Sequence, residues 1–135
     1  MAAYLLILHR DRNRPALSPA EMAEIVRRYA EWGDALRARG KLISSEKLAP
    51  GGHCIRRQEG ALLVTDGPYA ETRDVIGGYY VFEAEDEAEA LAIAKSSPHL
   101  WSTNWIELRA VDRDAVAEAR ARVEEMSIPA GAERR

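Results

Sequence analysis

The chain has a single cysteine, Cys54, among its 135 residues. One thiol cannot form an intramolecular disulfide, which excludes the small secreted domains that depend on a disulfide framework. The three histidines, His9, His53 and His99, are scattered along the chain and have no metal-ligand spacing with the cysteine. No glycine-rich loop has the spacing of a phosphate or dinucleotide site. We therefore expect no metal and no cofactor.

Long hydrophobic runs and a surplus of one charge are also absent. The apolar run over residues 1–8 is far shorter than the roughly 20 residues that cross a bilayer, and it lacks the basic region and cleavage site of a signal peptide. The 19 basic and 22 acidic residues are interspersed and give a net charge of -3, so no basic stripe favours nucleic acid. These absences predict a cytoplasmic protein with no nucleic-acid partner and no membrane contact.

The residues that are present have the pattern of one α+β domain. Ser18 and Glu21 form a capping box around Pro19, which predicts the start of an amphipathic helix that ends at Gly40. Asp86 caps a second helix that ends before Pro98. A third helix is expected from residue 112 to residue 126. Strands are expected over residues 3–9, 41–48, 53–58, 61–65, 79–82 and 104–111.

This order of strands and helices is that of the ferredoxin-like fold, an antiparallel sheet with two helices on one face. We assign residues 1–111 to this domain and residues 112–135 to a C-terminal helix with a frayed tail. Helices on one side only leave the other face of the sheet open, and apolar surface there must be buried. Two copies packed sheet to sheet bury it, so we expect a homodimer.

Alternation along the strands indicates which side chains line that second face. In residues 104–111 the purely apolar alternate positions belong under the helices, which puts Glu107 and Arg109 on the open face. The candidate ligand-binding residues on this face are Tyr79, Trp105, Glu107 and Arg109. A small-molecule site is one interpretation, and a structural ion pair between Glu107 and Arg109 is the other.

Three further residues are candidates for acid–base catalysis: Asp66, Glu71 and His99. The carboxylates of Asp66 and Glu71 fall in one loop and have the chemistry of a general base. Asp66 is equally suited to accept backbone N–H groups at the first position of a turn. His99 follows the second helix, where it can exchange protons near neutral pH or donate to the last carbonyls of that helix.

The most distinctive stretch is residues 64–73, which read Val-Thr-Asp-Gly-Pro-Tyr-Ala-Glu-Thr-Arg, followed by Val-Ile-Gly-Gly-Tyr-Tyr-Val over residues 75–81. It resembles the signature of the YCII-related family in its DGPF-type branch, with Tyr69 in place of the usual Phe. The resemblance covers residues 3–111. It implies a dimeric α+β barrel built from two ferredoxin-like sheets. It also implies a possible partner, since relatives are joined to or encoded beside extracytoplasmic-function sigma factors.

Two hypotheses of function follow. The first is a dimeric small-molecule-binding or regulatory module, with a sigma factor as a possible partner. The alternative is a cofactor-free enzyme that carries out acid–base chemistry on a small polar or aromatic substrate. In that alternative Asp66, Glu71 and His99 exchange protons and Arg109 stabilises an anion.

Overall fold

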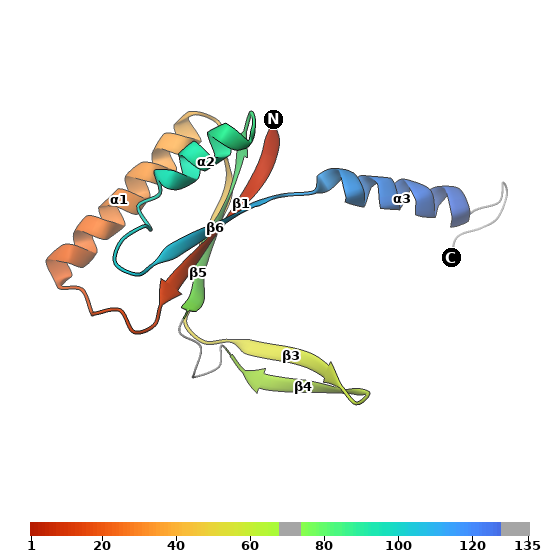
Figure 1. Ribbon diagram of the computed structural model, residues 1–135, viewed down its shortest axis with the longest axis horizontal. Helices are drawn as coiled ribbons and strands as arrows, with labels where there is room; N and C mark the ends of the chain where they lie inside the picture. The colour runs from red at the N-terminus through yellow and green to blue at the C-terminus, as the bar shows by residue number, and fades with distance from the viewer. Residues whose placement is uncertain (68–73, 128–135) are drawn as a thin grey trace.

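The computed structural model describes residues 1–67 and 74–127 of the chain (Figure 1). Its elements, in chain order, are β1 (Ala2–Asp11), α1 (Pro19–Ala38), β2 (Leu42–Lys47), β3 (His53–Gln58), β4 (Ala61–Asp66), β5 (Asp74–Ala84), α2 (Glu87–Lys95), β6 (Trp105–Ala110) and α3 (Arg113–Ser127).

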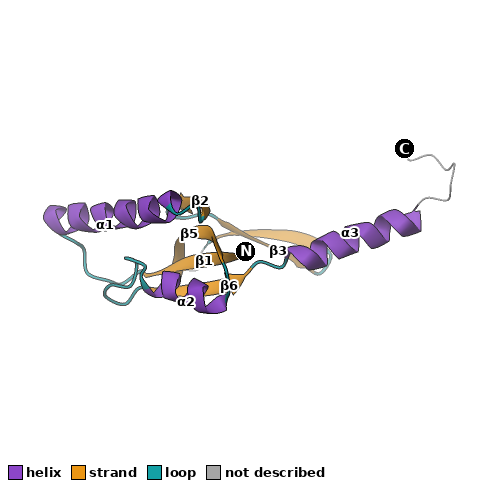
Figure 2. Ribbon diagram, turned by 90° about the horizontal axis from the view of Figure 1, so that it is seen from above, coloured by secondary structure: helices purple, strands orange, loops and turns teal. Residues whose placement is uncertain are grey.

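Four of the strands form one antiparallel sheet in the order β2-β5-β1-β6. Helices α1 and α2 lie on the same side of this sheet (Figures 1 and 2). The strands β3 and β4 form a separate two-stranded hairpin. The predicted ferredoxin-like α+β fold with an added C-terminal helix is therefore confirmed.

The hydrophobic core lies between the sheet and the two helices. Leu6 of β1 and Phe82 of β5 have no exposed surface, and Leu36 of α1 is 3% exposed. Burying a side chain of this size contributes about 1.5–3 kcal/mol. The other buried members of this core are Tyr4, Leu8, Ala84, Ala90, Ile93 and Ala94.

The predicted capping box at the start of α1 is confirmed. The backbone N–H of Glu21 donates to Ser18 Oγ over 3.1 Å, and the backbone N–H of Ser18 donates to Glu21 Oε1 over 3.0 Å. Two donors that the first turn of a helix leaves without partners are thus satisfied. Gly40, with φ of +69°, follows the end of the helix in the left-handed conformation that glycine adopts without strain.

Strand β5 begins at Asp74, five residues before the expected start at Tyr79, so the expectation of a loop over residues 74–78 was wrong. The extra residues pair with the end of β1, where Asp11 lies opposite Asp74. The backbone of β5 approaches β2 closely at Gly78. A Cβ there would lie 2.7 Å from the carbonyl oxygen of Glu46 on β2, so only glycine lets these strands approach.

Two elements extend away from the sheet on the side opposite α1 and α2: the β3–β4 hairpin and α3 (Figures 1 and 2). Helix α3 has no buried residue. Ile55 and Leu62 of the hairpin are 65% and 63% exposed. Within the described residues, no helix is long and apolar enough to cross a membrane.

Replacing the cap of α1 tests the account of its start. We expect Ser18→Ala to lower the free energy of unfolding by about 1 kcal/mol, because the Glu21 N–H loses its acceptor. Ser18→Asp keeps an acceptor and is expected to retain wild-type stability. Urea denaturation measures both variants, and an equal loss in the two would contradict this role of Ser18.

Candidate functional site

The face of the four-stranded sheet away from α1 and α2 has an apolar centre. Tyr80, Ile106 and Leu108 pack against the core, so their strand neighbours lie on the opposite face. Two rows cross this open face from β5 over β1 to β6: Tyr79, Ile7 and Glu107 in one, and Val81, Leu5 and Arg109 in the other. The residues of β1 and β5 in these rows are half-buried. They form a floor bordered by polar side chains of β6.

Four side chains along the β6 edge of this face form a continuous chain of contacts. The rings of His9 and Trp105 stack in parallel, with centroids 3.8 Å apart and planes 3° apart. His9 Nε2 lies 3.1 Å from Glu107 Oε1. Arg109 donates to Glu107 Oε2 over 3.3 Å. The His9 side chain is only 13% exposed, so its ring is held from two sides.

The register between β1 and β6 positions this chain of contacts. His9 lies directly opposite Trp105, and Ile7 lies opposite Glu107. Glu107 is therefore the diagonal neighbour of His9 on the same face, within reach of long side chains. His9 was not among the predicted site residues, because β1 is apolar on both faces and its sequence does not show which face a residue occupies. The sequence does show that His9 lies two and four residues after Ile7 and Leu5, and this spacing places the three residues on one face of the strand.

The charge of Glu107 determines which nitrogen of the neutral His9 ring carries the proton. The hydrogen bond with His9, and then the one from Arg109, hold the pKa of the Glu107 carboxyl below its usual range. An ionised carboxylate only accepts hydrogen bonds, so His9 Nε2 donates the proton. In the neutral ring Nδ1 then carries the free lone pair. The pair of His9 and Glu107 is thus a base oriented by a carboxylate, a combination that can transfer protons.

His99 lies in the connection between α2 and β6 and is 5% exposed. Its Nε2 donates to the backbone carbonyl of His9 over 2.7 Å, and its Nδ1 accepts from the Tyr29 hydroxyl over 2.5 Å. Burial lowers the pKa of the His99 imidazole and raises that of Tyr29, so both groups stay neutral. Both ring nitrogens of His99 are thus engaged in hydrogen bonds. The ring donates to a backbone carbonyl of β1 and not to the last carbonyls of α2, which was one of the two expected roles.

The other two candidates for catalysis lie apart from His99. Asp66 ends β4 in the hairpin sheet, where its side chain is fully exposed and 3.7 Å from His53 Nδ1. Glu71 lies outside the described residues. Asp66 and His99 therefore belong to different layers of the molecule, whereas Tyr79 shares the open face with the β6 residues Trp105, Glu107 and Arg109.

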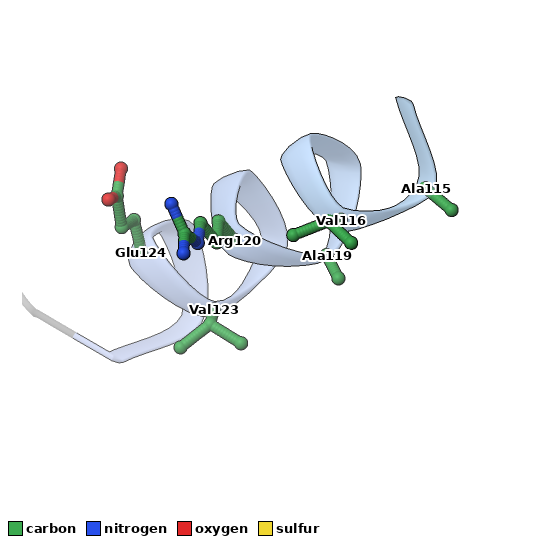
Figure 3. Close-up of a pocket in the computed structure, with 6 residues that line it drawn as sticks. All are labelled: Ala115, Val116, Ala119, Arg120, Val123 and Glu124. Carbon is green, nitrogen blue, oxygen red and sulfur yellow. The ribbon is translucent and has the colours of Figure 1, made fainter. Parts of the chain in front are cut away.

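Two hollows among the described residues lie away from this face. One of 510 Å³ runs along α3, and all six of its lining residues belong to that helix, with Ala119 and Val123 among them (Figure 3). A cleft of 250 Å³ lies between α1 and the strands β2 and β5, lined in part by Gly33 and Tyr80. In the described part of the chain, no group of three or more acidic, histidine or cysteine side chains is placed to hold a metal ion.

The chain matches a known family. The family model of the YCII-related domain matches residues 3–124. The match runs past residue 111, where we expected the resemblance to end, and so includes most of α3. Comparison with the curated proteins gives no match.

The buried state of His99 predicts a pH dependence of stability. Its pKa is lowered in the folded protein, whereas an unfolded histidine titrates near 6.5. As the pH falls through this value, the unfolded state takes up the proton first, so the free energy of unfolding falls below pH 6.5 and is fully retained above it. Urea denaturation at about pH 7.5 and about pH 5.5 brackets this window.

Two matched variants isolate the contribution of His99. His99→Leu removes the titrating ring, and we expect its stability to differ less between the two pH values than that of the wild type. His53→Leu removes a histidine whose side chain is 67% exposed and is expected to keep the wild-type difference. An unchanged pH dependence in His99→Leu would show that another group carries it.

Proposed function

The chain belongs to the YCII-related family, and on this premise we propose that it is a homodimeric module that binds a small aromatic carboxylate on the open face of its sheet. One observation carries the proposal: an apolar floor of β1 and β5 meets the contact chain of His9, Trp105, Glu107 and Arg109 at the β6 edge. Small-molecule sites combine apolar lining with a few polar groups that fix orientation.

The distribution of uncovered apolar surface supports the homodimer. The hairpin and α3 extend on the side to which the open sheet face looks (Figures 1 and 2). The exposed apolar side chains on these three surfaces include Ile55, Leu62, Leu63, Val64, Ile76, Trp105, Val116, Val123 and Met126. Monomers rarely expose large contiguous apolar patches. A second copy seated on this side covers all three surfaces through an isologous contact.

The side chains of the face support the ligand class. Trp105 is 41% exposed and Tyr79 is half-buried, so both rings offer surface to an aromatic body. Arg109 is the positively charged residue in the two rows, and its side chain is 66% exposed. Arginine binds carboxylates with two parallel hydrogen bonds. The acidic side chain of Glu107 is already held by His9 and Arg109, so it does not repel a ligand as a free carboxylate would.

A regulatory role is included in the proposal. A ligand that binds only the dimer stabilises it by a free energy that rises with the logarithm of the ligand concentration once this exceeds the dissociation constant. A partner that recognises the dimer, such as the sigma factor that the DGPF-type resemblance suggests, would then respond to the ligand. We place this activity in the cytoplasm. Co-purification of the sigma factor with ligand-treated protein alone would support this regulatory role. Equal co-purification with and without the ligand would contradict it.

The dimer is tested by light scattering coupled to size-exclusion chromatography. We expect the wild type to have twice the 15.0 kDa mass of one chain. Val81→Arg puts a charge in the apolar floor and is expected to give the monomer mass. Leu91→Arg, on an exposed position of α2, is the matched control and is expected to stay dimeric. A wild-type mass of 15.0 kDa would contradict the proposal.

Binding is tested by titration calorimetry with 3-phenylpropionate, which has an aromatic ring and a carboxylate. We expect Arg109→Ala to weaken the affinity by about 10–100-fold, because a hydrogen bond to a charged group contributes about 1.5–3 kcal/mol. Arg28→Ala removes an arginine of α1 and is expected to leave the affinity unchanged. Absence of binding to the wild type, or equal affinity for Arg109→Ala, would overturn the ligand site.

A further inference from the structure

His9 is held as a base that still has a free acceptor atom. Glu107 accepts the proton on Nε2, and Trp105 covers one face of the ring. No hydrogen bond to His9 Nδ1 is recorded from the described residues. The lone pair on Nδ1 is therefore the one strong proton acceptor that the contact chain leaves unused, because the carboxylate oxygens of Glu107 are both engaged.

A carboxylate and an aromatic face flank the His9 ring. The Glu107 carboxylate faces Nε2 and stabilises the imidazolium by charge. The indole face of Trp105 adds an attraction between cation and aromatic ring. Arg109 is the facing cation on β6, and its guanidinium binds the far oxygen of the same carboxylate. Tyr79 of β5 lies one row away across Ile7, and Glu46 of β2 lies opposite Tyr79. Glu83 is the acidic residue of β5 on the same face.

We propose that His9 is a catalytic base that removes a proton from a carbon acid bound at the open face, with Glu107 as its positioning residue. The substrate class is an aryl-substituted 2-oxo acid, whose C3–H bond lies between the aromatic ring and the carbonyl. This step depends on the ligand site proposed above and adds a reaction to it. The aromatic body lies on the floor and the carboxylate on Arg109.

The reaction is a proton transfer that needs no oxidant, reductant or co-reactant. His9 Nδ1 takes the C3 proton, and the electron pair of the broken C–H bond forms the C2–C3 double bond. The carbonyl electron pair moves to its oxygen, which gives an enolate. Arg109, beside the carboxylate, stabilises the negative charge that develops on this oxygen. The proton on Nδ1 exchanges with water, and return of a proton from Nδ1 to C3 regenerates the 2-oxo acid.

The test is exchange of the C3 hydrogens of phenylpyruvate for deuterium, followed by proton NMR in deuterated buffer of low concentration. We expect the wild type to exchange faster than buffer alone and His9→Gln to be at least about 100-fold slower, which is the usual contribution of a general base. His53→Gln is the matched control, because its ring belongs to the exposed hairpin. We expect it to exchange at the wild-type rate.

The role of Glu107 has its own readout. In Glu107→Gln a neutral amide replaces the charge that stabilises the imidazolium. We expect slower exchange and a pH profile whose rising limb moves to lower pH, whereas a purely structural loss would lower the rate without moving the profile. A profile with the wild-type midpoint would remove Glu107 from the proposal.

Binding of 3-phenylpropionate separates failure of the reaction from failure of the site. Because this ligand has no carbonyl at C2, it reports the site without the chemistry. If the wild type binds it but exchanges phenylpyruvate no faster than buffer, or if His9→Gln binds it and exchanges at the wild-type rate, His9 is not the base. If the wild type does not bind it, the proposed ligand site itself is overturned.

Discussion

Leu6 and Phe82 lie on neighbouring strands and are completely buried beneath α1 and α2. Because side chains alternate along a strand, this burial determines the face that the other residues of these strands occupy. Once Leu6 faces the helices, Leu5, Ile7 and His9 must face the other way. A slip of one residue would expose the core and bury the polar side chains. The open face is therefore a consequence of the core, and its residues are as strictly placed as those beneath the helices.

The two histidines at the end of β1 connect the two faces of the sheet. His99 is neutral and buried on the side of α1, where it accepts from Tyr29 and donates to the carbonyl of His9. The ring of His9 lies on the open face against Trp105 and Glu107. His99 thus holds the backbone of His9 in place, and in this way a buried structural residue supports the proposed site.

Local sequence signals predicted the elements well, because each signal acts over a few residues. The capping box at Ser18 and the glycine at Gly40 mark the ends of α1 with chemistry that is complete within a turn. The start of β5 was missed, because it is set by pairing with β1, more than 60 residues earlier, and not by the local composition of residues 74–78.

The face of β6 was also predictable, since the purely apolar alternate positions of that strand identify the core side and leave Glu107 and Arg109 opposite. His9 was not predictable in this way. Its partners depend on the register of β1 against β6, and that register is a property of the assembled sheet. The partners of His99 lie 70 and 90 residues away, so its neutral structural state needed the fold.

The most direct test of the central claim, that a second copy and an aromatic carboxylate meet at the open sheet face, is a crystal structure of the protein grown with 3-phenylpropionate. The account predicts two sheets facing each other, with the ligand between them, its carboxylate on Arg109 and its ring beside Trp105. A ligand bound elsewhere, or an open face covered by α3 of the same chain, would contradict it.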